Sequence, residues 1–186
     1  MTNQSGGSQF LDPQKIINEV GIKAGQQLGE LGCGAVGYFV FPLAKQVGKE
    51  GHVYAVDIRR LVLEGIKNRA RIDGMENIET IWSNLEVFKG TGIPDNTLDV
   101  ALLITVLFQN QKKEDILIEA IRMIKPGGYL AVVDWQKKKE SFIGPAMEVR
   151  VEPQKVVEFC QSKGLTVAEE FIPSNFHFGL LFKKVK

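Results

Sequence analysis

Cysteine and histidine are scarce in this sequence. Only Cys33, Cys160, His52 and His177 are of these types among the 186 residues, and no CxxC pair occurs. Two distant cysteines do not make the disulfide framework of a small secreted domain. Structural zinc needs four ligands, usually in close pairs, so we expect no metal site. We predict reduced thiols in a cytoplasmic protein.

Charge of one sign and long apolar runs are also missing. The formal net charge is +1, which gives no reason to expect a nucleic-acid partner. No stretch has the roughly 20 apolar residues that cross a bilayer. The polar start, MTNQSGGSQF, lacks the apolar core of a signal peptide. We therefore expect neither a nucleic-acid partner nor a membrane partner.

The remaining composition is that of one ordinary globular domain, with 44% hydrophobic residues. We predict a flexible tail over residues 1–9 and a single domain over residues 10–186. A first short helix follows Asp12, which suits a cap, and Pro13, which suits a first turn. Strands and helices then alternate. The predicted strands are 27–31, 52–56, 78–82, 98–104, 129–133, 165–172 and 178–184, and the predicted helices are 35–47, 59–71, 113–124 and 153–163.

This alternation predicts an α/β fold, a Rossmann-like parallel sheet with helices on both faces. The run Leu98 to Ile104 is almost wholly apolar, as a central strand buried on both faces should be. The last two strands are joined by a short turn, Pro173 to Asn175, and so must be antiparallel. We expect seven strands, mostly parallel, with an antiparallel last strand.

A glycine-rich loop connects the first strand to the next helix. It reads Glu30-Leu31-Gly32-Cys33-Gly34-Ala35-Val36-Gly37. Glycines let the backbone turn sharply and approach a ligand, and the following helix points free N–H groups at it. The spacing Gly32-x-Gly34-x-x-Gly37 also satisfies the dinucleotide fingerprint, so alone it does not identify the ligand.

Two acidic residues narrow the choice of ligand. Asp57 ends the second strand, where a carboxylate accepts hydrogen bonds from both ribose hydroxyls of a nucleoside. NAD and S-adenosylmethionine share that ribose. Glu30 would repel a nearby pyrophosphate, whereas it suits the ammonium of a methionine moiety. A helix cap is the structural alternative for Asp57.

The glycine loop with Glu30, Asp57 after the second strand, and Lys125-Pro126-Gly127-Gly128 before the fifth together resemble class I S-adenosylmethionine-dependent methyltransferases. Within that superfamily the chain is most similar to the small ubiquinone/menaquinone-biosynthesis type. The resemblance covers residues 10–186.

The resemblance implies roles for individual residues toward S-adenosylmethionine and its product S-adenosylhomocysteine. Glu30 would contact the amino group, and the loop would line the methionine part. Asp57 would hold the ribose and Ile58 would pack on adenine. Asn84 stands where the family commonly has an acid that contacts the adenine amine. The implied cofactor contacts are Glu30, Gly32, Cys33, Gly34, Gly37, Asp57, Ile58, Asn84, Leu85 with its backbone N–H, Thr105 and Val106.

The acceptor is less defined. Methyl transfer needs a base only if the nucleophile must lose a proton. His177 should emerge at the ligand edge of the sheet and His52 at the opposite edge, so His177 is the tentative base, with a strand-end histidine as the alternative. Tentative substrate contacts are Asp134, Glu148, Arg150 and Phe176. The absence of an Asn/Asp-Pro-Pro-Tyr/Phe box after the fourth strand leaves a small organic acceptor as the expectation.

Other functions remain open on the sequence alone. A nicotinamide-dependent oxidoreductase needs a proton donor, and no Tyr-x-x-x-Lys pair is present. A catalytically silent cofactor-binding module would carry the same loop. A macromolecular acceptor such as tRNA is disfavoured by the small size and neutral charge. Oligomeric state, acceptor and pathway are not indicated.

Overall fold

The computed structural model describes residues 8–137 and 143–185. Seven strands alternate with five α-helices and two short 3-10 helices within these ranges. The α-helices are α1 (Pro13–Val20), α2 (Val40–Val47), α3 (Arg60–Ile72), α4 (Lys113–Met123) and α5 (Pro153–Ser162), and the 3-10 helices are η1 (Ser8–Phe10) and η2 (Leu107–Gln109). The strands are β1 (Gln27–Leu31), β2 (His52–Asp57), β3 (Ile78–Trp82), β4 (Leu98–Ile104), β5 (Ile124–Trp135), β6 (Leu165–Ser174) and β7 (His177–Lys184).

All seven strands form one sheet in the order β3-β2-β1-β4-β5-β7-β6. The five strands β1 to β5 pair in parallel, whereas β7 runs antiparallel to both β5 and β6. The order reverses between β1 and β4, and ligands bind beyond the carboxyl ends of strands at such a switch point. The predicted Rossmann-like fold with an antiparallel last strand is confirmed.

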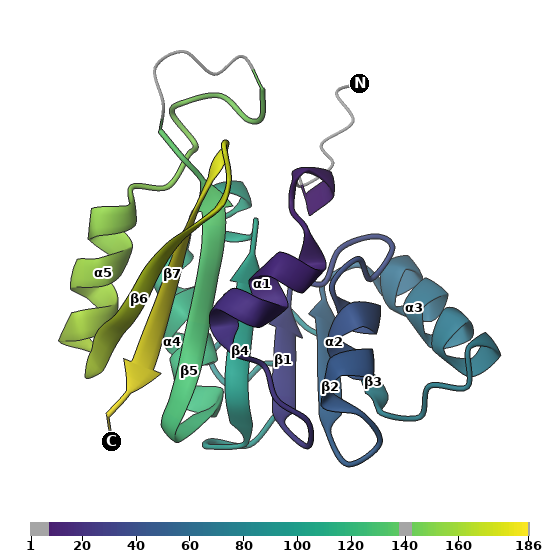
Figure 1. The fold of residues 1–186 in the computed structure, drawn as a ribbon. Helices are drawn as coiled ribbons and strands as arrows, with labels where there is room; N and C mark the ends of the chain where they lie inside the picture. The colour runs from purple at the N-terminus through teal and green to yellow at the C-terminus, as the bar shows by residue number, and fades with distance from the viewer. Residues whose placement is uncertain (1–7, 138–142, 186) are drawn as a thin grey trace.

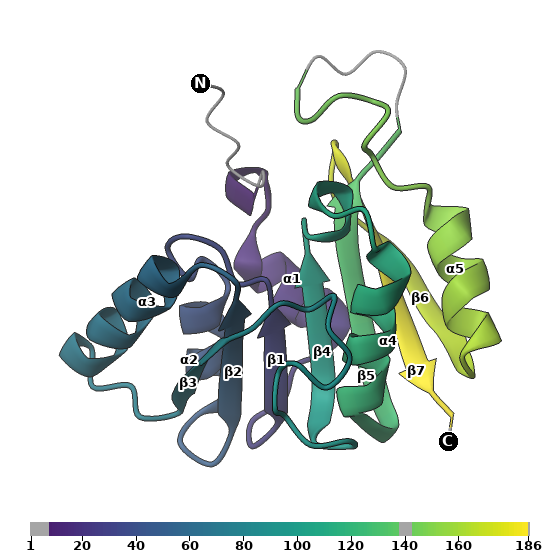
Figure 2. The ribbon, with the colours of Figure 1, turned by 180° about the vertical axis from the view of Figure 1, so that it is seen from behind.

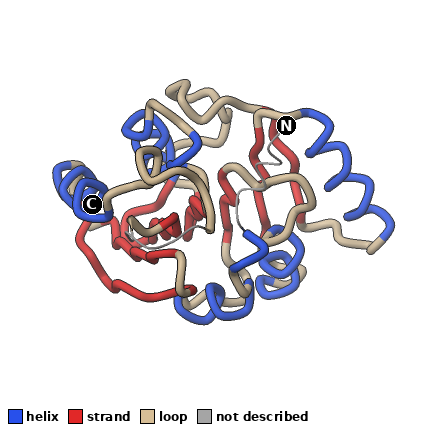
Figure 3. The backbone as a smooth tube through the Cα atoms, turned by 90° about the horizontal axis from the view of Figure 1, so that it is seen from above, coloured by secondary structure: helices blue, strands red, loops and turns tan. Residues whose placement is uncertain are grey.

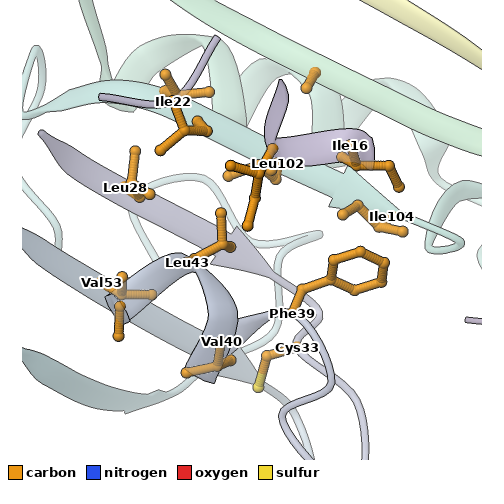
Figure 4. Packing of buried hydrophobic residues seen from close by; sticks show 14 of the residues in the cluster. Ile16, Ile22, Leu28, Cys33, Phe39, Val40, Leu43, Val53, Leu102 and Ile104 are labelled. Atoms are coloured by element: carbon orange, nitrogen blue, oxygen red, sulfur yellow. The ribbon is translucent and has the colours of Figure 1, made fainter. Parts of the chain in front are cut away.

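Helices cover both faces of the sheet. Helices α1, α2 and α3 lie on one face and α4 and α5 on the other (Figures 1 and 2). Each face has its own apolar cluster, because alternate residues of a strand point to opposite sides. Figure 4 shows the first cluster, where Leu43 of α2 packs over Leu28, Val53 and Leu102 of three neighbouring strands. All four side chains are fully buried.

The sequence signals at the ends of several helices are confirmed. Asp12 caps α1, since its Oδ1 accepts a hydrogen bond from the Gln14 N–H at 2.9 Å. Gly21 then ends α1 in the left-handed conformation, with φ of 71°. Among the helices within the described ranges, none has the length and apolar character to cross a membrane.

Three predicted boundaries are wrong. Helix α2 begins at Val40 rather than Ala35, because Gly32, Gly34 and Gly37 all adopt positive φ and the chain turns twice before the helix starts. The β6–β7 connection is a two-residue turn at Asn175 and Phe176, so β6 continues through the predicted turn to Ser174. At the opposite edge of the sheet, the strand predicted at 129–133 extends from Ile124 to Trp135, so residues 125–128 belong to β5.

Candidate functional site

A cavity of about 630 Å³ opens at the carboxyl ends of β1, β2, β3 and β4. Figure 3 looks from above onto this edge, where loops gather between the two layers of helices. The lining residues come from the last residues of β1, β2 and β4, from the loops that follow these strands and β3, and from η1, η2 and α4. They are Gln9, Glu30, Gly32, Cys33, Gly34, Ala35, Val36, Tyr38, Phe39, Asp57, Ile58, Arg59, Ser83, Asn84, Leu85, Ile104, Thr105, Val106, Gln109, Asn110 and Ile116.

The backbone of the glycine loop leaves room for a ligand to approach it closely. Gly32 has φ of 84°, and a Cβ there would lie 2.7 Å from Cγ2 of Val106, so a side chain at Gly32 would collide with the loop after β4. Gly34 has φ of 70°, and a Cβ there would meet no atom within 4 Å. The N–H groups of Gly32 and Cys33 both donate to the Val56 carbonyl, at 2.8 and 2.9 Å, which fixes the loop on β2.

Glu30 places in the wall of this cavity a carboxyl group that lacks a full set of hydrogen-bond partners. Its side chain is buried, and Oε2 has no hydrogen-bond partner. Burial raises the pKa of Glu30 well above its usual range. An unpaired buried carboxyl group costs free energy of folding, so its position in the cavity wall indicates a ligand that donates hydrogen bonds.

Asp57 lies across the loop from Glu30 and is fully hydrogen bonded. Its Oδ1 accepts from the N–H of Arg59 at 2.9 Å and from Arg59 Nε at 3.0 Å. Its Oδ2 accepts from Arg59 Nη2 and from the Gly34 N–H, both at 3.1 Å. Burial alone would raise the pKa of Asp57, but the Arg59 and Gly34 hydrogen bonds outweigh it and hold the pKa below the usual value. Asp57 is therefore an ionised carboxylate.

The end of the cavity at β3 contains the predicted residue Asn84 and a second polar residue, Ser83. Asn84 lines the cavity, but its Oδ1 accepts the Glu86 N–H at 2.9 Å in a local turn. The preceding residue, Ser83, is buried in the wall, and its Oγ has no partner. Ile58 is 57% exposed and offers an apolar surface, and Leu85 is buried beside it in the lining.

The loop after β4 is held in a strained conformation. Thr105 has φ of 55°, which is rare for a β-branched residue. Two amide side chains of the next turn bind this loop, since Gln109 Nε2 donates to the Thr105 carbonyl at 2.6 Å and Asn110 Nδ2 to the Val106 carbonyl at 2.8 Å. All four residues line the cavity, so the strain is stored in its wall.

The predicted base and acceptor contacts lie outside this lining. His177 is fully buried, its Nδ1 pairs with Ser174 Oγ at 2.8 Å, and its ring lies 4.2 Å from that of Trp135. Its Nε2 has no hydrogen-bond partner. Burial, with the positive charge of Arg150, lowers the pKa of His177 to about 4. Proton uptake at neutral pH is thereby disfavoured.

The other predicted acceptor contacts surround the same aromatic region. Asp134 is buried and accepts the N–H groups of Trp135 and Phe108, and burial raises its pKa to about 7. Arg150 is buried and donates to carbonyls of its own loop and of the β5 end, those of Pro145, Gln136 and Ile143. Glu148 is exposed, whereas Phe176 is half-buried and packs its ring against that of Phe10 at 5.6 Å.

Sequence reasoning missed several lining residues. Arg59 and Ser83 are absent from the predicted contacts, although each directly adjoins one of them. Gln109 and Asn110 lie in the connection after the fourth predicted strand, where their polar character was the available signal. Tyr38 lies inside the predicted helix 35–47, so no sequence signal marked it. No group of three or more metal-ligating side chains occurs within residues 8–137 and 143–185.

Comparison with protein families gives one match over most of the chain. The model of a family described as a methyltransferase domain matches residues 22–170. The ubiquinone/menaquinone biosynthesis C-methyltransferase UbiE of Hydrogenovibrio crunogenus is 30% identical over 145 residues, which are 77% of this chain and 56% of that protein. The chain spans about half the length of the curated relatives it matches.

Solved structures agree in fold. A S-adenosylmethionine-dependent methyltransferase from Aquifex aeolicus is similar with a TM-score of 0.84 and 26% identity, over 98% of this chain and 95% of that one. The cyclase SpnF is similar with a TM-score of 0.77 and 14% identity, over 92% of this chain and 79% of that one, which shows a shared fold alone.

Proposed function

Because this chain belongs to the S-adenosylmethionine-dependent methyltransferases, we propose that residues 10–186 act as one catalytic domain that methylates a small-molecule acceptor in the cytoplasm. The observation that carries the cofactor site is the unpaired Oε2 of Glu30 in the wall of the cavity. An ammonium group would donate the missing hydrogen bonds and, by its positive charge, lower the raised pKa of Glu30, whereas a pyrophosphate would bring only acceptors and further negative charge.

The rest of the cavity fits the other parts of S-adenosylmethionine. The open space next to Gly34 accommodates the methionine chain, which Gly32, Cys33 and Gly37 of the loop would also contain. Asp57 would accept the ribose hydroxyls, as acids at the end of a second strand do in nucleoside sites. Thr105 and Val106 would contact the methionine portion from β4.

The adenine end combines apolar and polar contacts. Ile58 would pack on one face of the base. The unpaired Ser83 Oγ suits a ring nitrogen or the amine, and it joins Asn84 and the Leu85 N–H as the proposed polar contacts. Ser83 is favoured over the Asn84 Oδ1, because that oxygen is already used by Glu86.

The bound cofactor supplies an activated methyl group on a sulfonium, so the protein mainly binds, orients and excludes water. Tyr38, Gln109 and Asn110 line the cavity next to the proposed methionine contacts and are proposed to bound the acceptor. His177 as base and Asp134, Glu148, Arg150 and Phe176 as acceptor contacts stay predictions. They require an acceptor that reaches past Phe10 to the aromatic residues at the end of β5.

Thermal stability with added ligand tests the cofactor. A ligand that binds only the folded protein raises its stability by RT ln(1 + [L]/Kd). We expect S-adenosylmethionine and S-adenosylhomocysteine to raise Tm, and NAD and NADP to leave it unchanged. Asp57→Ala should remove the shift. Asp99→Ala is the matched control, because Asp99 begins β4 at the opposite edge of the sheet and should leave the shift intact.

Turnover separates the enzyme from a catalytically silent module. Formation of S-adenosylhomocysteine on addition of small aromatic, thiol or amine acceptors would support the enzyme. Stabilisation by nicotinamide cofactors alone would instead make the protein a dinucleotide-binding oxidoreductase. Cofactor binding without turnover across the acceptor classes would favour the silent module.

A further inference from the structure

Asp57, the carboxylate proposed to bind the ribose, has no free acceptor site for a ribose hydroxyl. A carboxylate accepts hydrogen bonds at about four lone-pair sites, two on each oxygen. Asp57 receives four donors, two on Oδ1 and two on Oδ2. Its side chain is only 5% exposed. A ribose diol therefore has to displace donors that are already in place.

The four donors differ in how readily they move. Two are backbone N–H groups, those of Gly34 and Arg59, and their positions are set by the glycine loop and the start of α3. The other two are Nε and Nη2 of the Arg59 side chain, which is 56% exposed. An exposed guanidinium exchanges its carboxylate for water at small cost, whereas the backbone groups cannot leave without unfolding the loop.

The geometry points to Arg59 as a positioning residue that occupies the ribose-binding face of Asp57 until the cofactor arrives and then leaves it. The inference rests on the proposed function, since it takes the ligand to be a nucleoside with a free diol. In the absence of cofactor, the Arg59 side chain orients the carboxylate with two parallel N–H···O bonds. It also keeps Asp57 ionised, which is the form that accepts both ribose hydroxyls.

Displacing the Arg59 side chain from Asp57 costs free energy, and this cost weakens the binding of the cofactor. The guanidinium is the exposed partner of a buried carboxylate, so solvent screening keeps the pair near the range of surface ion pairs, about 0.2–1 kcal/mol, which corresponds to an affinity change of up to about fivefold. Deleting the guanidinium should therefore tighten binding, the opposite of what deletion of an ordinary ligand contact does. Salt screens exposed ion pairs, so the effect should shrink as the ionic strength rises.

Arg60 offers a matched control next in the chain. Its guanidinium stacks on the Trp82 ring at 3.8 Å from the ring centroid and does not line the cavity. Arg60→Ala removes the same charge from the same end of α3. It leaves all four hydrogen bonds of Asp57 in place, so it reports the effect of net charge alone.

The test is calorimetric titration of the full chain with S-adenosylhomocysteine, which is overall neutral. We expect Arg59→Ala to lower Kd about two- to fivefold at about 10 mM NaCl, Arg59→Lys to lower it less, and Arg60→Ala to leave it unchanged. The gap between wild type and Arg59→Ala should narrow at about 0.5 M NaCl.

A Kd for Arg59→Ala that is equal to or higher than that of wild type would overturn this inference, while binding by wild type would leave the proposed cofactor standing. An equal decrease of Kd in Arg60→Ala would also overturn it, because the effect would then be one of charge. Failure of every protein to bind S-adenosylhomocysteine would contradict the proposed cofactor and this inference together.

Discussion

Replacement of Glu30 by glutamine should stabilise the ligand-free protein and weaken cofactor binding. Glu30 is buried, its Oε2 has no hydrogen-bond partner, and no cation pairs with it among the described residues. Glu30→Gln keeps the shape of the side chain and removes the group that burial holds protonated in the folded protein. Stability and binding should therefore change in opposite directions, as is common at functional sites.

The size of the stability effect follows from proton linkage. Burial raises the pKa of Glu30 well above its usual value, so the folded protein binds more protons than the unfolded chain above about pH 4.5. Holding such a group neutral at pH 7 costs at most about 3 kcal/mol. The glutamine amide keeps part of the desolvation cost, so we expect a gain of about 1–2 kcal/mol and a rise in Tm of roughly 3–6 °C. The gain should vanish below about pH 4, where both side chains are neutral.

Glu119 provides the contrasting variant. It is equally buried, but its carboxylate accepts hydrogen bonds from Thr91, the Lys89 N–H and Arg122, and its pKa is lowered. Burial opposes that shift, and the hydrogen bonds outweigh it. Glu119→Gln should therefore destabilise the protein by about 1–3 kcal/mol, because it removes the charge-assisted hydrogen bonds of Glu119 while Arg122 keeps its ion pair with Asp95.

Urea unfolding at pH 4 to 8 measures both variants, and calorimetry with S-adenosylhomocysteine measures binding. Loss of a charge-assisted hydrogen bond should weaken binding to Glu30→Gln at least about tenfold. Destabilisation by Glu30→Gln at pH 7, or a gain that persists unchanged at pH 4, would refute the assignment of Glu30 as an unpaired carboxyl group.

Three further variants test the glycine loop and two buried titratable side chains. Gly34→Ala should cost about 1–2 kcal/mol of stability, because φ of Gly34 is 70°, and should therefore lower Tm. The added methyl group should also weaken S-adenosylhomocysteine binding. Unchanged binding would mean that the ligand does not use the open space beside Gly34. Burial raises the pKa of Asp134 to about 7, so wild type should lose stability as the pH rises from about 4 to 7, and Asp134→Asn should remove that loss in urea unfolding. Burial lowers the pKa of His177 to about 4, so wild type should lose stability as the pH falls from about 6.5 to 4, and a slope that persists in His177→Phe would exclude His177 as its source.

Much of the fold could be predicted because local pattern and tertiary structure agree. The apolar run Leu98 to Ile104 is the central strand β4, buried between two layers of helices. The Lys125-Pro126-Gly127-Gly128 stop agrees with the end of α4 at Met123. The membership in the methyltransferases was likewise available from the glycine loop, Glu30, Asp57 and Lys125-Pro126-Gly127-Gly128 taken together, whereas the loop and Asp57 alone also suit a dinucleotide.

Other features depend on contacts that no local pattern carries. The stretch from Ala35 to Phe39 is compatible with a helix, but Gly37 has a φ of 60°, which no right-handed helix contains, and a Cβ there would lie 2.9 Å from the Phe41 ring. Asn84 Oδ1 accepts the Glu86 N–H, whereas the neighbouring Ser83 hydroxyl is buried without a partner, and only the folded loop shows which of the two polar groups is occupied. The burial of His177 against Trp135 depends on β7 pairing with β5, which brings together residues far apart in the chain.

The decisive experiment is a structure of the chain in complex with S-adenosylhomocysteine. We expect the amino group within hydrogen-bond distance of Glu30 Oε2, both ribose hydroxyls on Asp57, and adenine between Ile58 and Ser83. A ligand bound outside the glycine loop, or with its ribose away from Asp57, would refute the proposed cofactor site.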